Sequence, residues 1–443
     1  MSLVQLIFTY IFLVVGTINF LHLGLYIIGA NVYDILAFRR KRKLTAKNRL
    51  QSHSWWVHNR LRGNSPVFNK LVSVIIPAHN EELAIEQCLD SIRKNTYRNV
   101  EIIVHNDRSS DSTAKIVRAY IQKFPTMRVR LVSRRHNVGK GAGLNYCIKK
   151  YATGQLVMTL DADCLLDKHA IANAVAYFDD KSVLGVAANV KLLETPSVLG
   201  LLQRFEHMIG YRSKKFYTLA NCEIIVGGVA STYRADVLRE VALYDTDTQT
   251  EDIGLSMKII AHYGKAGRIV YAADVLAMTE PVQTFPDLLK QRYRWKLGML
   301  QNLFKYRSLT GNLRGKYNKM LTLYRMPMAF FGEVVLMLEP ILIGYIAYLS
   351  ILHGTVLLFF GAYITITLYV LSGIWPDEHM TNRQKFTQSL YAPFMYFIFY
   401  IMDVVQVVAI FRVLARPRRV LNRNTAESSW ISPKRAARAT ASA

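Results

Sequence analysis

An apolar run ends in two closely spaced acids in the stretch GQLVMTLDADC, residues 154 to 164. Residues 155 to 160 are mostly apolar without a clean alternation, which is typical of a strand covered on both faces of a parallel sheet. Asp161 and Asp163 follow at the carboxyl end of that strand, where open α/β sheets bind their ligands. Two acids flanking one small residue can hold Mg²⁺ or Mn²⁺ against phosphate oxygens. Short acidic triplets also occur in surface turns, so this stretch alone leaves both interpretations open.

The surrounding region, residues 71 to 280, alternates strand-like and helix-like segments. The strand-like segments are residues 71–77, 100–107, 155–160 and 267–272, and the helix-like segments include 81–95 and 111–124. Strands that alternate with helices predict a mostly parallel sheet with right-handed crossovers. We therefore expect an α/β domain that binds a nucleotide.

Acidic side chains recur where the predicted strands end. Glu81 follows the first strand, Asp107 follows the second, and Asp161 and Asp163 follow a later one. These strand ends could converge on one cleft. Helix capping is the simpler explanation of acids in such places, and it accounts well for Asp111.

The segment NVGKGAGLN, residues 137 to 145, is not explained by capping. Its three glycines bracket Lys140. Glycines let the backbone approach an anion, and a lysine supplies a positive charge, so the segment predicts a diphosphate site. Walker A spacing is missing, and we do not expect P-loop chemistry.

Two further motifs lie downstream. TQTEDIGLSMKI, residues 248 to 259, places Glu251 and Asp252 ahead of an amphipathic stretch, and KQRYRWKLG, residues 290 to 298, places Gln291, Arg294 and Trp295 at i, i+3 and i+4. On a helix these three residues share one face. An indole can stack on a sugar ring while the other two side chains hydrogen-bond hydroxyls and phosphate. An interfacial helix with its Trp at headgroup level explains the second motif equally well.

The composition favours a membrane protein with a reduced, cytosolic face. The chain of 443 residues has 56 Lys plus Arg against 31 Asp plus Glu, a net charge of +25. Next to long apolar runs, this excess indicates the anionic face of a bilayer rather than nucleic acid. The four cysteines show no metal-binding or disulfide spacing.

Four apolar runs are candidate membrane spans: residues 3–28, 328–349, 356–374 and 390–414. The first is followed by RRKRK, residues 39 to 43, which predicts an uncleaved anchor with a cytoplasmic C-terminal end. Three late spans would place the C-terminus outside, whereas RPRR at residues 416–419 favours the inside. The side of the C-terminus therefore stays open. Glu333 and Glu339 lie inside a predicted span, where they line a polar cavity, snorkel or bond to another helix.

These features divide the chain into six parts. We expect an N-terminal anchor (1–38), a basic interfacial linker (39–70), a catalytic α/β domain (71–282), amphipathic interface helices (283–326), three transmembrane helices (327–415) and a basic, disordered tail (416–443).

Taken together, the motifs resemble those of the processive family-2 inverting glycosyltransferases, the membrane synthases of cellulose, chitin oligosaccharides, hyaluronan and poly-N-acetylglucosamine. The matching residues are IIPAHNEE, NDRSSDST, GKGAGLN, DADC, TED and QRYRW, in this order within residues 70 to 300. VHNDRSSDST and EPVQTFPDLLKQRYRWKLG are most similar to the poly-β-1,6-N-acetylglucosamine synthase branch. The resemblance implies a GT-A domain flanked by transmembrane helices.

The resemblance also implies a role for each matching residue. Asp252 is expected to be the general base that deprotonates the acceptor hydroxyl, and Asp163 to bind Mg²⁺ or Mn²⁺. The other expected residues fall into two groups: donor and nucleotide binding (Ala78, Glu81, Asp107, Lys140, Asp161), and the acceptor and diphosphate site (Glu251, Gln291, Arg294, Trp295). A single displacement at the anomeric carbon needs such a base and a positively charged diphosphate site.

The implied partners are a UDP-sugar donor, expected to be UDP-N-acetylglucosamine, a polysaccharide acceptor, and the lipid bilayer of the inner or plasma membrane, with the catalytic domain cytoplasmic. A small membrane accessory subunit is compatible with the resemblance, and nucleic acid is not expected. Two other classes stay open: a non-processive transferase that adds one sugar to a lipid carrier, and a nucleotide-binding membrane transporter or scaffold. A base at Asp252 separates an enzyme from a binding module.

Overall fold

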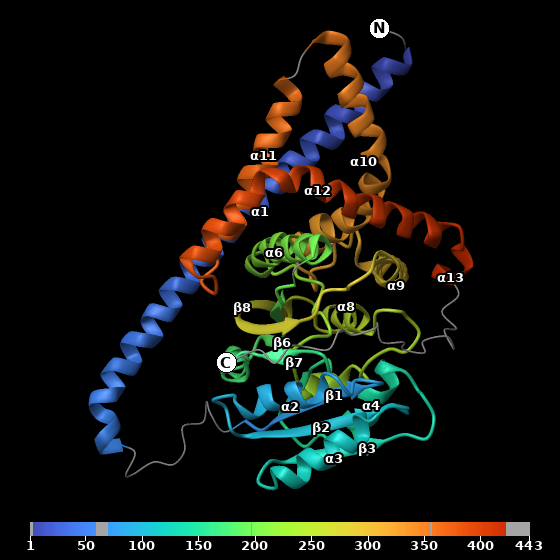
Figure 1. Ribbon diagram of the computed structural model, residues 1–443. Helices are drawn as coiled ribbons and strands as arrows, with labels where there is room; N and C mark the ends of the chain where they lie inside the picture. Colours follow the sequence, from blue (N-terminus) through green and yellow to red (C-terminus); the bar gives the residue numbers. More distant parts are fainter. Residues whose placement is uncertain (1–2, 59–69, 196, 355–356, 422–443) are drawn as a thin grey trace.

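The structure, a computed structural model, describes residues 3–58, 70–195, 197–354 and 357–421 (Figure 1). An α/β domain lies below a set of long apolar helices. Its strands are β1 Val72–Ala78, β2 Val100–Asn106, β3 Val129–Ser133, β4 Leu156–Thr159, β5 Leu165–Leu166, β6 Val183–Leu192, β7 Ser231–Arg234 and β8 Arg268–Thr279.

The helices of the domain and of its upper surface are α2 Ile85–Arg93, α3 Thr113–Lys123, α4 Lys140–Lys150, α5 Ala170–Tyr177, α6 Val198–Leu219, α7 Ala235–Glu240, α8 Glu251–Tyr263 and α9 Phe285–Lys305. The remaining helices are α1 Leu3–His58, α10 Met326–His353, α11 Leu357–Ile374, α12 Asn382–Leu414 and α13 Pro417–Leu421, with a π-helical turn, η4, at Met320–Arg325.

One sheet with the strand order β3-β2-β1-β4-β7-β6-β8-β5 organises the domain. The pairs β1–β2, β1–β4, β2–β3 and β6–β8 are parallel, whereas β4–β7, β6–β7 and β5–β8 are antiparallel. In register, Val72 of β1 lies opposite Val100 of β2 and Leu156 of β4. The parallel pairing of β1 with both neighbours brings the carboxyl ends of β1, β2 and β4 to one edge.

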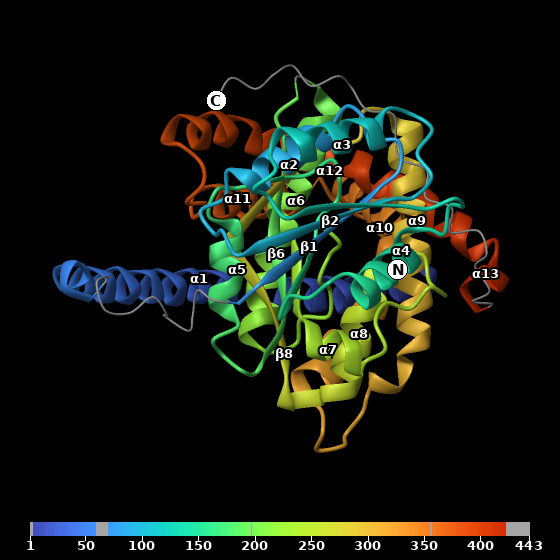
Figure 2. The same cartoon turned by 90° about the horizontal axis from the view of Figure 1, so that it is seen from below.

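Helices cover both faces of this sheet, which explains why its strands are so apolar. Helices α2, α3 and α5 lie on one face and helices α4, α7 and α8 on the other (Figure 2), and their buried side chains pack against the strands in two apolar clusters. Within β4 every side chain is buried. The strand predicted within residues 155–160 is therefore confirmed as an interior strand of a mostly parallel sheet.

The predicted helix at 81–95 is shorter than expected, because residues 81–84 form a turn in which the Glu81 carbonyl accepts hydrogen bonds from the Ala84 and Ile85 backbone N–H groups. The strand predicted at 267–272 is longer than expected and reaches Thr279, since β8 pairs with β6 and β5. The N-cap of α3 is Ser112, not Asp111, but Asp111 lies just before it and its Oδ1 accepts a hydrogen bond from the Thr113 backbone N–H at 3.0 Å.

All four cysteines are free and buried. The helix α1 continues through His58, so much of the expected linker prolongs the anchor helix. Residues 59–69 of that linker and residues 422–443 of the expected tail lie outside the described residues.

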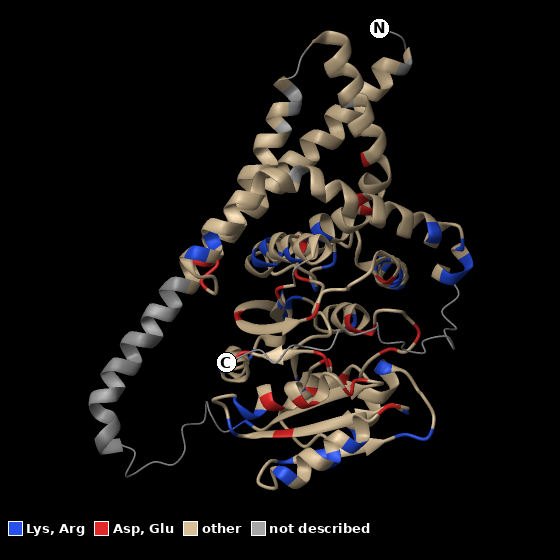
Figure 3. Cartoon of the chain, in the orientation of Figure 1, with Lys and Arg blue, Asp and Glu red and all other residues tan. Residues whose placement is uncertain are grey.

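Three helical stretches of the described chain are long and apolar enough to cross a membrane: Gln5–Ala37, Met320–His353 and Phe397–Leu414. A fourth apolar stretch, Tyr363–Ile374, is shorter. Figure 3 shows few charged residues on α10, α11 and the upper part of α1, whereas Lys, Arg, Asp and Glu gather on the domain. Three of the four expected spans therefore meet the length and composition of a membrane span, and the fourth, in α11, is shorter.

The helix α12 begins and ends beside the α/β domain. Just before its start, Asp377 pairs with Lys191 of β6 at 2.7 Å. In its middle, Met402 packs against Leu199 and Leu202 of α6, and near its end Val413 packs against α9. Figure 1 shows α12 lying across α6 and α9 rather than rising away from them. Residues 416–421 therefore lie on the domain side, which removes the conflict between three late spans and a basic C-terminal end.

Candidate active site

A pocket of about 390 Å³, open to solvent, lies where β1, β2 and β4 end. It is lined by the six residues predicted for donor and metal binding, together with four others: Pro77, Ala78, His79, Glu81, His105, Asp107, Lys140, Asp161, Ala162 and Asp163. The convergence of strand ends expected from the sequence is confirmed. Parallel pairing causes it, because three strands running the same way deliver their following residues to one edge of the sheet.

Asp107 holds the loop that leads into α4. Its Oδ1 accepts a hydrogen bond from the Val138 backbone N–H and its Oδ2 one from the Gly139 N–H, both at 2.9 Å. Gly139 has a φ of 81°, a left-handed conformation that glycine adopts without strain. The carboxylate thus fixes the glycine-rich segment over the pocket, and the chain enters α4 at Lys140.

Lys140 is the centre of a charged cluster. Its Nζ donates to Asp161 Oδ1 at 2.6 Å and lies 3.7 Å from Glu251 Oε1. Burial by itself lowers the pKa of Lys140, but the carboxylates of Asp161, Glu251 and Asp252 together raise it above its ordinary value. A Cβ at position 228 would lie 2.7 Å from Lys140 Nζ, so Gly228 leaves the space that the ammonium group occupies. The lysine is therefore a fixed positive charge beside the pocket.

Asp252 lies in the first turn of α8, next to this cluster. Its Oδ1 accepts a hydrogen bond from the Ile253 backbone N–H at 2.9 Å, and a Cβ on Gly228 would lie 3.6 Å from its Oδ2. Burial, followed by the negative charge of Glu251, raises the pKa of Asp252 to about 6, although Lys140 acts in the opposite direction. A carboxylate with this pKa is suited to accept a proton near neutral pH.

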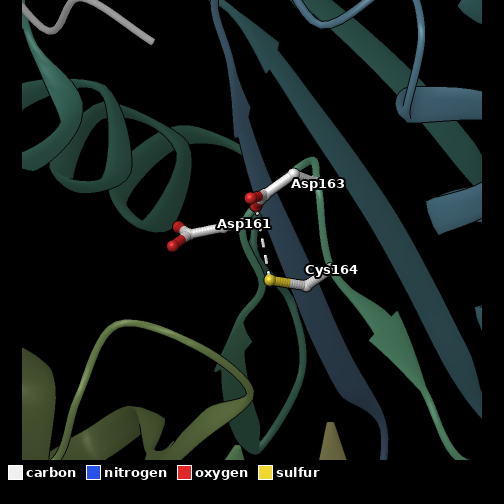
Figure 4. Close-up of side chains that lie close together, drawn as sticks. All are labelled: Asp161, Asp163 and Cys164. Atoms are coloured by element: carbon white, nitrogen blue, oxygen red, sulfur yellow. Dashed lines mark hydrogen bonds between the residues drawn. The ribbon is translucent and has the colours of Figure 1, made fainter. Parts of the chain in front are cut away.

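The acid pair has the donor atoms that a hard cation requires. Ligand atoms of Asp161, Asp163 and Cys164 lie within 4.8 Å of one another. Asp163 accepts hydrogen bonds from Cys164 Sγ at 3.4 Å and from Thr279 Oγ1 at 3.1 Å, and Figure 4 shows the first of these. Burial raises the pKa of the Cys164 thiol well above its ordinary value, so the thiol stays protonated. The residues therefore fit Mg²⁺ or Mn²⁺ held by two carboxylates, with the thiol acting only as a donor to Asp163.

The three predicted acceptor residues on α9 have surroundings that differ from one another. Burial lowers the pKa of the Arg294 guanidinium, and the charges of Glu251, Asp161 and Asp252 oppose this, so Arg294 lies within electrostatic reach of the carboxylate cluster. Trp295 instead lies under Arg292, whose Cζ is 4.3 Å from the ring centroid.

Arg292 in turn pairs with Glu206 of α6 at 2.7 Å. One ring face of Trp295 is thereby covered by protein. Gln291 is half-buried on the same helix. The structure thus brings Arg294 to the charged cluster, while Gln291 and Trp295 are not among the residues that line the pocket.

Several residues beside the pocket were not predicted. His79 and His105 line it, Gly228 makes room for Lys140, and Thr279 bonds Asp163. The glycine pair in VGGVAST, residues 226 to 232, is a sequence signal for a close backbone approach. No sequence pattern marks Thr279, because β8 reaches Asp163 only through the order of strands in the sheet.

Gly143 offers a test of how tightly α4 packs beneath the pocket. A Cβ there would lie 2.4 Å from Cε1 of the fully buried His105, whereas a Cβ at Gly141 would meet only Glu251, at 3.5 Å. We expect Gly143→Ala to destabilise the domain by about 1–3 kcal/mol, because the ring has to move. Gly141→Ala, in the same helix, should be neutral or stabilising by up to about 1 kcal/mol. Denaturant unfolding of both variants measures the difference, and equal stabilities would contradict the tight packing.

Comparison with known proteins identifies the class. Residues 73–241 match the family model Glycosyl transferase family 2. These residues are therefore similar to family-2 glycosyltransferases, and the expected α/β architecture, with a mostly parallel sheet and apolar helices before and after the domain, is confirmed.

Curated relatives specify the resemblance further. The chain is 32% identical over 231 residues to a poly-beta-1,6-N-acetyl-D-glucosamine synthase of Staphylococcus epidermidis, covering 51% of this chain and 54% of that protein. A synthase of the same name from Staphylococcus aureus (strain COL) is 32% identical over 230 residues, with the same coverage. The chain spans about half the length of the curated relatives it matches.

Two solved structures are also similar. Mannosyltransferase PcManGT from Pyrobaculum calidifontis, in complex with GDP-Man and Mn²⁺, has a TM-score of 0.49 at 20% identity, covering 80% of this chain and 98% of its own. S. aureus TarS 1–349 in complex with UDP-GlcNAc has a TM-score of 0.38 at 19% identity, covering 62% and 87%.

Proposed function

We propose that the protein is a membrane-embedded, processive β-glycosyltransferase, a polysaccharide synthase that transfers N-acetylglucosamine from UDP-N-acetylglucosamine to the growing end of a polysaccharide. The observation that carries this proposal is the adjacency of a donor pocket to a carboxylate with a raised pKa. Lys140 joins the two, because its Nζ contacts Asp161 at the pocket and lies 3.7 Å from Glu251, the residue before Asp252. A nucleotide-binding scaffold has no use for such a base.

The chemistry is a single inverting displacement. Asp252 takes the proton of the acceptor hydroxyl as its oxygen attacks the anomeric carbon, and the bond to the diphosphate breaks on the opposite face. Lys140 and Arg294 stabilise the negative charge that develops on the leaving diphosphate, and Lys140 is held in place before the reaction by its hydrogen bond to Asp161. Asp107 and the glycine-rich loop that it fixes bind the nucleotide.

Asp161 and Asp163 would hold Mg²⁺ or Mn²⁺. When bound, the cation supplies positive charge to the diphosphate oxygens. Lys140 also neutralises part of the negative charge that Asp161 and Asp163 bring together.

The membrane helices fit a role in handling the product. We propose that α1, α10 and α11 cross the bilayer and that α12 lies along its cytoplasmic surface, where it packs against α6 and against α9, the helix that carries Gln291, Arg294 and Trp295. Lys296 of α9 pairs with Glu333 of α10 at 2.8 Å, so one of the two acids predicted inside a span connects the interface helix to a membrane helix. A growing chain that leaves the site next to α9 would thus meet the membrane helices directly.

The proposal is tested with membranes that contain the full-length protein. They are incubated with radiolabelled UDP-N-acetylglucosamine or UDP-glucose, and the product is digested with linkage-specific hydrolases. We expect a polymer from UDP-N-acetylglucosamine that is sensitive to a β-1,6-specific enzyme. Transfer of a single sugar to lipid would indicate the non-processive alternative, and UDP binding without transfer would indicate a transporter or scaffold.

The raised pKa of Asp252 predicts the pH dependence of transfer. The base works only as a carboxylate, so the protonated fraction below its pKa is inactive. With the pKa at about 6, the rate should rise with pH through about 6 and fall tenfold per pH unit well below it. A pH–rate profile at saturating donor measures this limb. A rate that is constant from pH 5 to 7 would contradict the assignment of the base.

A further inference from the structure

The helix that carries Arg294 and Trp295 also holds the segment that leads to the proposed base. Gln301, which is 1% exposed, lies two turns beyond Arg294 on α9. Its Oε1 accepts a hydrogen bond from the Gln249 backbone N–H at 2.9 Å, and its Nε2 donates one to the Arg419 carbonyl oxygen at 2.8 Å. One buried amide thus connects two backbone segments that are distant in the sequence.

The neighbouring residue fixes the same segment. Asn302 is fully buried, and its Nδ2 donates to the carbonyl and hydroxyl oxygens of Thr250, both at 3.1 Å. A Cβ at Gly298 would lie 2.3 Å from Thr250 Oγ1, so the missing side chain lets α9 approach this closely. Thr250 is the N-cap of α8, and the second residue of α8 is Asp252. The position of the base is therefore set from α9.

The other partner of Gln301 belongs to the C-terminal end of the described chain. Val420 of α13 is 6% exposed and packs in an apolar cluster with Leu297, Leu300 and Val413. This packing presents the Arg419 carbonyl to Gln301. Docking of α13 on α9 and placement of residues 249–250 thus share one side chain.

We propose that Gln301 is a positioning residue: it holds residues 249–250, and through them Asp252, at a fixed position relative to Arg294. Because Gln301 also bonds the Arg419 carbonyl oxygen, this position depends on the docking of α13 on α9. The inference rests on the proposed function, because it assigns Gln301 a part in placing the proposed base. None of the residues that line the donor pocket belongs to this network. Loss of the Gln301 bonds should therefore affect turnover and leave donor binding intact.

The experiment uses the full-length protein in membranes and compares Gln301→Met with Lys290→Met, an exposed position on the same helix. Methionine keeps the length of the side chain and removes both hydrogen bonds. We expect kcat of Gln301→Met to fall by about 10- to 100-fold, because small displacements of a reacting group cost this much. KM for the UDP-sugar and the affinity for UDP should stay at the wild-type values, and Lys290→Met should match the wild type throughout.

A second pair of variants tests the link to α13. Val420→Asp places a charge in the apolar cluster and should lower kcat in the same way as Gln301→Met, whereas Leu421→Asp, at a position that is 67% exposed, should not. Equal turnover of Gln301→Met and Lys290→Met would overturn the proposal. A parallel loss of UDP affinity would also overturn it, because it would indicate a general defect of the fold. Absence of transfer by the wild-type protein would contradict the proposed function itself, which distinguishes the two failures.

Discussion

Asp252→Asn should lower sugar transfer by at least about 100-fold and by up to about 10,000-fold, the range that a general base contributes. The reason is local. The variant keeps the shape of the side chain and an oxygen that can accept the Ile253 backbone N–H, but it cannot take the proton of the acceptor hydroxyl. Affinity for UDP should change little, since Asp252 is not among the residues that line the donor pocket. Initial rates with labelled donor and calorimetric titration with UDP measure the two quantities.

Asp236→Asn is a matched control for this variant. Asp236 also lies in the first turn of a helix and also accepts the backbone N–H of the following residue, at 2.8 Å, but it is exposed on α7. It should transfer sugar at the wild-type rate. If Asp252→Asn polymerised sugar at nearly the wild-type rate, the base would be another residue. If UDP binding vanished as well, Asp252 would belong to the donor site or to the fold.

Asp163→Asn should lower transfer by about three orders of magnitude, because a bound cation supplies several kcal/mol of charge stabilisation to the leaving diphosphate and about 1.4 kcal/mol corresponds to a factor of ten. The protein should stay folded and inserted in the membrane, since the amide oxygen can still accept from Cys164 at the Oδ1 position and the amide N–H can donate to the Thr279 hydroxyl at the Oδ2 position. Excess EDTA should inactivate the wild-type protein, and Mg²⁺ or Mn²⁺ should restore its activity.

Asp167→Asn serves as the control for this effect. Asp167 is a half-buried acid that follows β5 and accepts the His169 backbone N–H at 2.9 Å, so its loss tests the general cost of removing a charge near the acid pair. Its transfer rate and its response to EDTA should equal those of the wild type. Wild-type transfer that persisted in excess EDTA would show that the acid pair acts without a metal.

The local sequence was sufficient to predict the main strands and helices of the α/β domain and the residues of the donor pocket. An apolar run without alternation predicts a strand covered on both faces, and the acids or amides that follow such runs must lie at strand ends. Asp107, Asp161 and Asp163 lie together for this reason, because parallel neighbours deliver their ends to one edge. Of the glycines around Lys140, Gly139 likewise has a local cause, its positive φ, whereas Gly143 is required by the close approach of His105 from β2.

The tertiary structure decided what depends on contacts between distant segments. Thr279 reaches Asp163 because β8 pairs with β5, Gln301 joins residue 249 to residue 419, and Trp295 lies under Arg292 rather than at the pocket. The course of α12 is of the same kind. Its composition is that of a membrane span, yet both of its ends lie beside the domain. The hydrophobicity of a helix determines that its apolar surface must be shielded from water. Only the packing of α6 and α9 against α12 determines that protein shields part of this surface.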